Sequence, residues 1–320
     1  MDAAFVISPD LAGQRLDAAL ARLLPQTGLR GGRRAIAAGL VLHNGRSGKA
    51  ACRLRAGDLL EVLERAAAAS WPRFLSRRGE YVFVDKPAGL HCASLVGGAN
   101  PGLEELLPEV LPAECGRARL LQRLDYETSG IVCAALNDGA AAAFRAAERE
   151  GRCEKRYLAV LLGNLSQRAT VRLGLDTVNR RKSRARALEA DATRWTEFWP
   201  LRHFDTAQAG RLFAIVPPED LPDAPVRSLT LAACRIRRGA RHQSRVHAAA
   251  LGHPLWGDML YGIPENSRTF PSCGPALYLH HGMISFPDGR CSLPPPWPLP
   301  KEFVRSARQW LESDPDSKWP

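Results

Sequence analysis

The chain has 320 residues, of which 45% are hydrophobic and 24% are charged. This composition excludes a disordered or fibrous protein, and the length allows one large core together with a small accessory domain. The formal net charge of +11 favours nucleic acid as a partner, because lysine and arginine side chains that neutralise phosphates release condensed counterions. Charge alone leaves open a basic protein that has no polyanionic partner.

The cysteines and the first residues bear on the compartment. The cysteines are scattered without a C-x-x-C pair, which predicts buried, reduced thiols and no zinc site: Cys52, Cys92, Cys115, Cys133, Cys153, Cys234, Cys273 and Cys291. Met1–Asp10 lacks a basic flank, which argues against a secretory signal. No apolar run approaches the roughly 18 residues that a membrane helix needs. We therefore expect a cytoplasmic protein that does not enter a membrane.

Residues 12–38 show the pattern of two short helices. Apolar residues recur at helical spacing from Leu16 to Leu24, and Pro25 ends the pattern. A second helix is expected from Arg30 to Ala38. Its arginines share one face, since residues three and four apart are neighbours on a helix, and this face suits contacts with phosphates: Arg30, Arg33 and Arg34. The alternative is a solvated basic helix that binds nothing.

A small sheet is predicted to follow these helices. The strand Val41–His43 precedes Asn44-Gly45, a strong hairpin signal, and a pairing strand is expected over Leu59–Leu63. This order, in "RLDAALARLL", "RRAIAAGLVLHNG" and "LRAGDLLEV", resembles the S4 RNA-binding domain over residues 12–64. Residues 1–65 hold ten Lys and Arg against six Asp and Glu, which suits phosphate binding. We therefore expect an S4-like domain over 1–65 and a linker over 66–77.

Beyond residue 77 the pattern changes to strands that outnumber helices. Strands are expected over 80–89, 129–136, 155–163 and 227–236, with helices over Asp138–Glu150 and Gln243–Leu251. The absence of strict β-α-β alternation favours an α+β fold on a mixed or antiparallel sheet. We assign residues 78–312 to this domain and 313–320 to a tail. The proline-rich Leu293–Pro300 is expected to be an extended surface segment.

The segment "QRLDYETSG", Gln122 to Gly130, carries the most informative polar residues. Asp125 lies just before a predicted turn that leads into a strand, a position from which a carboxylate faces a cleft. Taken alone, such an aspartate is more often a turn residue or half of a surface ion pair. The interpretation depends on the segments that accompany it.

Those segments are "VFVDKPAGLHCAS" at 82–94, "KRYLAVLLGN" at 155–164 and "RGARHQSRVHAAALGHPLWGDMLYG" at 238–262. In this order, around "RLDYETSG", they resemble the RluA-type family of RNA pseudouridine synthases. With the S4-like domain, the resemblance extends from about residue 12 to residue 290. It implies an α+β catalytic domain around a mixed sheet, with the active cleft across its middle.

The resemblance also implies roles for single residues. Asp125 takes the place of the catalytic aspartate, Tyr157 that of the active-site tyrosine, and Arg245 that of the arginine that pairs with the aspartate. A carboxylate held by a guanidinium stays charged, as a nucleophile or base must be. The tyrosine ring can stack on uracil, whereas its hydroxyl is a poor base at neutral pH. The remaining expected contacts with the substrate are Gln122, Arg123, His242 and Gln243.

Two positions depart from the family pattern and put contacts with the substrate in doubt. Gln122 stands where a histidine is common, and in Gly239-Ala240-Arg241-His242-Gln243 the arginine comes one residue late. A guanidinium at this shifted position is expected to point elsewhere. Lys86, before a proline, is expected to shape a turn beneath the cleft, with contact to a phosphate as the alternative.

The expected enzyme needs no cofactor and no metal, because the isomerisation involves no redox step. Histidines in "HQSRVHAAALGH" and at 280–281 are expected to be structural hydrogen-bonding groups, because no metal-binding spacing such as H-E-x-x-H occurs. The basic run "NRRKSRAR" at 179–186 is either a solvated loop or a contact with RNA. The S4-like domain favours ribosomal RNA as the partner, transfer RNA is the alternative, and we expect a monomer. An RNA-binding protein that has lost activity is the second class of function.

Overall fold

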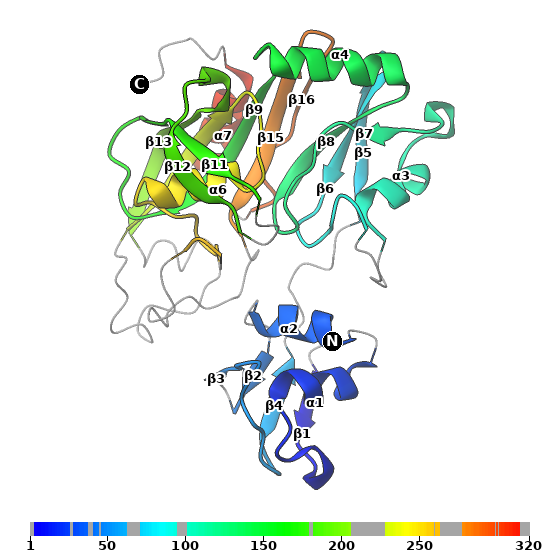
Figure 1. Cartoon of the computed structure of the whole chain (residues 1–320), viewed down its shortest axis with the longest axis vertical. Coiled ribbons are helices and arrows are strands. Elements are labelled where there is room, and N and C mark those ends of the chain that lie inside the picture. Colours follow the sequence, from blue (N-terminus) through cyan, green and yellow to red (C-terminus); the bar gives the residue numbers. More distant parts are fainter. Residues whose placement is uncertain are drawn as a thin grey trace. The chain divides into compact units, whose positions relative to one another are not determined.

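The computed structural model of the chain describes residues 3–25, 28–37, 41–44, 46–62, 71–94, 101–178, 182–205, 228–258, 260–262, 277–297, 299 and 301–313 (Figure 1). The chain divides into two compact units. The small unit contains Met1–Ala68 and Thr269–Ala276, and the large unit contains the rest of the chain. The large unit holds all of the candidate catalytic residues.

The small unit packs two helices on a sheet with the strand order β1-β4-β2-β3. Its elements are β1 (Ala3–Val6), a 3-10 helix (Pro9–Leu11), α1 (Leu16–Leu23), α2 (Gly28–Ala37), β2 (Val41–His43), β3 (Arg46–Ser47) and β4 (Leu59–Val62). The predicted hairpin is confirmed, with Asn44 at a left-handed φ of 51° in the turn. Leu16, Leu20 and Leu60 form part of its core. The unit therefore has a core of its own.

The large unit is built on a sheet with the order β10-β13-β14-β9-β15-β8-β6-β5, to which β16 and β7 add at β15 and β8. The strands are β5 (Arg73–Arg78), β6 (Tyr81–Lys86), β7 (Arg119–Leu120), β8 (Ser129–Ala135), β9 (Glu154–Leu162), β10 (Ala169–Val171), β13 (Thr196–Asp205), β14 (Ser228–Ile236), β15 (Leu279–Phe286) and β16 (Gly289–Ser292). A separate hairpin pairs β11 (Leu173–Asp176) with β12 (Arg184–Leu188).

Helices cover both faces of this sheet. They are α3 (Leu103–Val110), α4 (Asp138–Arg149), α6 (Gln243–Ala250) and α7 (Lys301–Glu312), with 3-10 helices at Ala113–Cys115 and Ala192–Arg194. Alternate residues of β9 belong to two cores because side chains of a strand point to opposite faces. Tyr157 lies in the core with Ala248 of α6 and Leu107 of α3. Leu158 lies in the core with Trp310 of α7. Figure 1 shows α4 across the strands and α6 beside the β11–β12 hairpin.

The sheet is mixed because β15 runs parallel to β8 and antiparallel to β9. The parallel pairing is short and places His281 opposite Gly130. Gly130 has a φ of 117°, and a Cβ added there would lie 2.3 Å from the backbone oxygen of His281. Only glycine allows the two strands to approach this closely. The segment that carries Asp125 enters the sheet at this junction.

The predicted α+β class is correct, and in the large unit all four predicted strands and both predicted helices are confirmed, with ends that differ by at most three residues. Two other assignments are wrong. Residues 73–77, assigned to a linker, belong to β5, an edge strand whose arginines face solvent. The proline-rich segment is not simply at the surface, because Trp297 is buried in the core with α7. In the described part of the chain, no helix combines the length and apolar character needed to cross a membrane.

Candidate active site

Asp125 lies in a turn that its neighbours hold in place. The backbone N–H of Thr128 donates to the Asp125 carbonyl at 3.1 Å, which closes the turn. The preceding Leu124 is buried, and its N–H donates to the sulfur of Cys92 at 3.2 Å. Burial raises the pKa of the Cys92 thiol, which therefore keeps its hydrogen for the Leu124 carbonyl, 3.6 Å away. The Asp125 side chain remains 22% exposed and is open to a ligand.

Lys86 joins the end of β6 to this turn. Its side chain is fully buried, and its ammonium group donates to the carbonyls of Pro87 at 2.9 Å, Leu90 at 2.8 Å and Tyr126 at 3.3 Å. A buried ammonium group is tolerated only when its hydrogens find acceptors. The prediction that Lys86 shapes a turn is confirmed. Because its ammonium group also bonds the Tyr126 carbonyl, it supports the backbone next to Asp125.

Arg245 on α6 connects two carboxylates. Its Nη1 donates to Oδ2 of Asp125 at 3.3 Å, while its Nε and Nη2 donate to the two oxygens of Asp258 at 2.8 and 2.7 Å. Burial opposes the charge of Arg245, but the hydrogen bonds and charge of Asp258, helped by Asp125, outweigh burial and raise its pKa. The guanidinium is thus permanently charged and fixed in orientation.

His242 approaches the other oxygen of Asp125, with 3.7 Å between Nε2 and Oδ1. It precedes α6 with a left-handed φ of 60°, which is uncommon for a residue other than glycine. Burial lowers the pKa of His242 and outweighs the opposing charge of Asp125, so the imidazole is neutral at pH 7. Each oxygen of Asp125 therefore faces a side-chain nitrogen, Oδ1 that of His242 and Oδ2 that of Arg245, and these two residues are only three apart in the chain.

Tyr157 on β9 is 8% exposed and stacks on His281, with ring centroids 4.5 Å apart and planes 25° apart. Burial raises the pKa of its hydroxyl, and the charge of Asp125 acts in the same direction. The hydroxyl keeps its hydrogen at neutral pH and does not act as a base. The ring has one face on His281, and its hydroxyl lies near enough to Asp125 to feel the charge of the carboxylate.

The other residues expected to contact the substrate divide into two groups. Arg123 is exposed. Gln122 instead turns inward, and its Nε2 lies 3.3 Å from the Ile131 carbonyl and 3.5 Å from Nδ1 of His281. The placement of Gln243 in the substrate site is wrong, because it is buried and its amide bonds Arg194, Thr196 and Ala240. The side chain of Arg241 donates to the Thr177 carbonyl at 2.7 Å.

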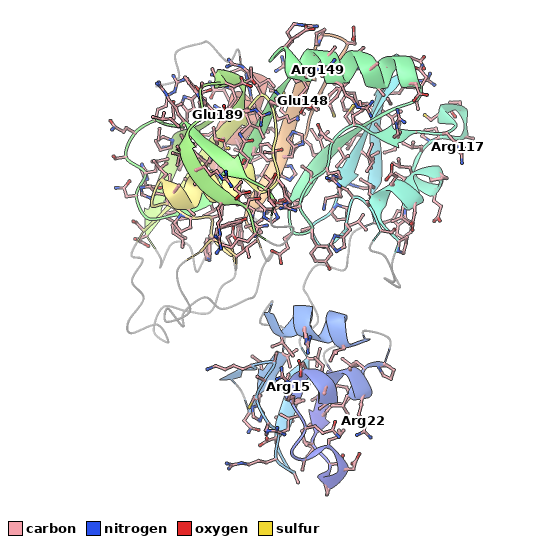
Figure 2. The ribbon with its side chains drawn as sticks, in the orientation of Figure 1. Arg15, Arg22, Arg117, Glu148, Arg149 and Glu189 are labelled. Atoms are coloured by element: carbon pink, nitrogen blue, oxygen red, sulfur yellow. The ribbon has the colours of Figure 1, made fainter. Side chains whose placement is uncertain are left out.

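The basic face predicted on the small unit is only partly described. Arg30, Arg33 and Arg34 lie on α2, but the side chains of Arg30 and Arg34 fall outside the described residues. Arg33 donates to the buried Asp17 at 2.7 Å, and Arg15 bonds the same carboxylate. The two arginines share one neutralising charge, which leaves one positive charge for a ligand. Figure 2 shows Arg15 and Arg22 at the helices of this unit.

Most of the histidines considered as metal ligands form hydrogen bonds with other residues of the chain. His247 bonds Thr196 and the Leu173 carbonyl, His253 bonds the Leu162 carbonyl, and His280 bonds Ser129. The prediction that these histidines are structural is confirmed. Among the residues that the structure describes, no three His, Cys, Asp or Glu side chains are placed to hold a metal ion.

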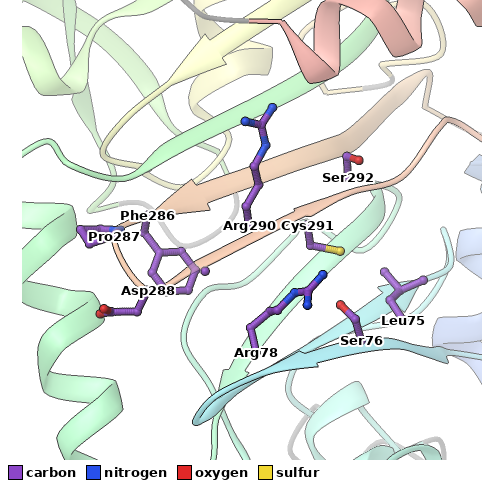
Figure 3. Close-up of a pocket in the computed structure, with 10 residues that line it drawn as sticks. Leu75, Ser76, Arg78, Phe286, Pro287, Asp288, Arg290, Cys291 and Ser292 are labelled. Atoms are coloured by element: carbon purple, nitrogen blue, oxygen red, sulfur yellow. The ribbon is translucent and has the colours of Figure 1, made fainter.

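A cavity of about 620 Å³ lies away from Asp125, between β5 and the β15–β16 hairpin. Figure 3 shows Arg78 and Cys291 facing each other across it. None of its lining residues belongs to the arrangement around Asp125.

Three more residues belong to this arrangement although no role was predicted for them: Asp258, Tyr261 and Ser183. Asp258 fixes Arg245 and also accepts the backbone N–H groups of Leu260 and Tyr261 at 2.9 and 3.1 Å. Asp258 lies in "GDMLYG", within the segment 238–262 that resembles the family. An acid in this segment could have been predicted as a partner for Arg245. Ser183 lies in the basic run interpreted as a solvated loop or a contact with RNA, yet it is 1% exposed.

Comparisons with known proteins show which family the chain resembles. A sequence profile of the family described as RNA pseudouridylate synthase matches residues 80–250. The ribosomal large subunit pseudouridine synthase D of Xylella fastidiosa is 28% identical over 260 residues, which cover 78% of this chain and 72% of that protein. The protein of the same name from Xanthomonas campestris pv. campestris is 29% identical over 266 residues, covering 80% and 74%. The solved structure of human RNA pseudouridylate synthase domain containing 1 superposes with a TM-score of 0.51 at 22% identity, covering 73% of this chain and 87% of that one.

Proposed function

The chain belongs to the RNA pseudouridylate synthase family, and from this premise we propose that it isomerises uridine in large-subunit ribosomal RNA with Asp125 as nucleophile or base. The family accounts for the isomerase activity. The role of Asp125 and the choice of RNA are the parts that the proposal adds.

The reaction exchanges one bond to the ribose for another. The bond between N1 of uracil and C1′ breaks, the base turns over, and C5 bonds to the same C1′. C5 then loses its proton and N1 gains one, so the net change is an isomerisation without an oxidant or reductant. Asp125 either attacks C1′ or removes the C2′ proton as uracil leaves, and both routes use the charged carboxylate.

The observation that carries the proposal is the ion pair between Asp125 and Arg245. The carboxylate is partly exposed, whereas the guanidinium beside it is 7% exposed and locked by the fully buried Asp258. Such a rigid donor holds one oxygen of Asp125 and leaves the carboxylate open on the solvent side. A surface ion pair with no function would not require a buried second acid to hold its arginine.

Tyr157 and Arg123 complete the proposed handling of the base. A uridine in a stacked helix must be extruded before C1′ and C5 become accessible, at a cost of a few kcal/mol. We assign Tyr157 to the wall against which the extruded uracil lies, since its hydroxyl is protonated and its ring is fixed on His281. Arg123, which is exposed beside Asp125, is assigned to the gap that the base leaves.

Ribosomal RNA is proposed as the partner on two grounds. The two named bacterial relatives are called ribosomal large subunit pseudouridine synthase D, and they align with most of this chain. The small unit is proposed to be an S4-like RNA-binding domain, with its helix α2 on the phosphates, and the net charge of +11 supports a polyanionic partner. Transfer RNA is the competing substrate.

The test maps pseudouridine by carbodiimide adducts after the protein is incubated with RNA from cells that lack its gene. We expect new pseudouridine in the large-subunit ribosomal RNA with the wild-type protein and none with Asp125→Asn. Asp138→Asn, which changes an exposed aspartate on α4, is the matched control and should retain activity. Activity in Asp125→Asn would refute the role of the aspartate, and new sites in transfer RNA alone would refute the choice of ribosomal RNA.

A further inference from the structure

Tyr261 connects the β11–β12 hairpin to the histidine beside Asp125. The backbone N–H of Ser183 donates to the Tyr261 hydroxyl at 2.7 Å, and this hydroxyl lies 2.8 Å from Nδ1 of His242. Ser183 is buried, and its own hydroxyl donates to the Arg241 carbonyl at 3.0 Å, next to His242. A continuous line of polar contacts therefore runs from the start of β12 to Asp125.

The directions of the hydrogens along this line are determined by chemistry. The Ser183 N–H can only donate, so the Tyr261 oxygen accepts and its own hydrogen is available for His242. A hydrogen accepted at Nδ1 leaves the neutral imidazole with its hydrogen on Nε2. Nε2 faces the Oδ1 of Asp125, 3.7 Å away, where a donor is favourable and a lone pair would be repelled. The two ends of the line select the same tautomer.

We propose that Tyr261 and Ser183 are positioning residues that hold His242 with its hydrogen on Nε2, and that this N–H is the second donor to the Asp125 carboxylate. The inference rests on the proposed role of Asp125. Arg245 holds Oδ2 and His242 holds Oδ1, so the carboxylate plane is fixed by two donors on different nitrogens. At 3.7 Å this contact is longer than a hydrogen bond in the free protein, and catalytic hydrogen bonds commonly tighten only when the substrate binds.

The charges around Tyr261 fit this role. The Arg245 guanidinium lies 5.4 Å from the centre of the Tyr261 ring, and the Lys182 ammonium lies 5.3 Å from it. Burial raises the pKa of the Tyr261 hydroxyl, although the backbone bond from Ser183 opposes the change, so the phenol keeps the hydrogen that it gives to His242. The hairpin strand β12 exposes Arg184 and Arg186 at its surface. RNA bound there would lie on the element that supports the nucleophile.

The experiment replaces Tyr261 by phenylalanine, which keeps the ring and removes only the hydroxyl. We expect kcat to fall roughly tenfold, because His242 is no longer held to donate one hydrogen bond to the charged Asp125, while the Kd for the RNA stays unchanged. In ¹⁵N-labelled protein, the His242 signals should show hydrogen on Nε2 in the wild type and a mixture of tautomers in Tyr261→Phe. Tyr81→Phe, which removes a buried phenol hydroxyl bonded to the Ala140 carbonyl, is the matched control and should leave kcat unchanged.

Two substitutions of His242 separate positioning from packing. The amide nitrogen of glutamine is as many bonds from Cβ as Nε2, so His242→Gln can donate to Asp125, whereas His242→Asn ends at the position of Nδ1 and cannot. We expect His242→Gln to keep most of kcat and His242→Asn to lose it, and Tyr261→Phe to cause no further loss in the His242→Asn background. An unchanged kcat in Tyr261→Phe, hydrogen on Nδ1 in the wild type, or equal losses in the two His242 variants would overturn the inference. Loss of activity in Asp125→Asn alongside any of these results would leave the proposed function standing.

Discussion

The buried pair of Arg245 and Asp258 gives a prediction with a magnitude. In Asp258→Asn the side chain keeps its shape but loses its charge, and one of its atoms becomes an N–H donor that faces an arginine donor. Breaking a buried ion pair costs about 3–5 kcal/mol, because the remaining charge stays desolvated. Arg245 keeps one contact with Asp125 at 3.3 Å, so we expect the lower end of this range, a loss of about 3 kcal/mol in the free energy of unfolding.

Urea denaturation followed by tryptophan fluorescence measures this loss. With a denaturant slope of about 3 kcal/mol per molar, the midpoint should move down by about 1 M. The pseudouridine assay should show a lower kcat as well, since the guanidinium that holds Asp125 has lost its fixed orientation. Asp138→Asn breaks an exposed pair with Arg119 and should barely move the midpoint. A midpoint for Asp258→Asn equal to that of this control would show that Asp258 does not hold Arg245.

Two further predictions concern the junction of the sheet and the buried histidines. Gly130→Ala puts a methyl group 2.3 Å from the His281 backbone oxygen, so the variant should lose stability and activity together, and unchanged thermal unfolding would contradict this. Burial lowers the pKa of His247 and His280 to about 4 and that of His281 to about 3. Because these values lie below the unfolded value of about 6.5, the folded chain binds fewer protons, and the free energy of unfolding falls as the pH drops from about 6.5 towards 4, by up to about 1.4 kcal/mol per pH unit for each histidine. Urea midpoints at about pH 7.5 and pH 5.5 check this, and a higher midpoint at the lower pH would refute it.

Elements that are marked by a local pattern could be predicted from the sequence. The nearly continuous apolar runs of β8 and β9 and the asparagine cap before α4 are readable within a few residues, and the structure has these elements with nearly the expected bounds. The helix α7 was missed although Phe303, Ala307 and Trp310 recur at helical spacing, so this element could have been predicted. The burial of Trp297 could not be predicted, because its proline-rich neighbours show no regular pattern.

The site residues divide along a similar line. Asp125 and Arg245 were found as a pair from the motifs that surround them, although 120 residues separate them. Gln243 belongs to the same motif as Arg245, and the motif could not show that neighbouring residues on α6 point to opposite sides, with Gln243 held by Thr196. Ser183 lies in a run of basic residues that gave no sign of a structural role. Only the folded hairpin shows that its backbone N–H donates to the Tyr261 hydroxyl. Contacts between segments without a local signature could not be inferred from the sequence.

The junction between β8 and β15 explains why Asp125 lies where it does. Here a parallel pairing adjoins antiparallel ones. The parallel contact of β8 with β15 involves only two residue pairs, whereas β8 pairs antiparallel with β6 on its other edge over six. The turn before such a short pairing is not absorbed into the ladder, so it leaves a polar side chain free to face solvent. Gly130 allows the close approach at the junction, and His281, held opposite it, provides the ring on which Tyr157 stacks. The contact between Gly130 and His281 thus fixes both the strand that follows Asp125 and the ring that supports Tyr157. We therefore expect a substitution of Gly130 to lower kcat although Gly130 does not contact a reacting group.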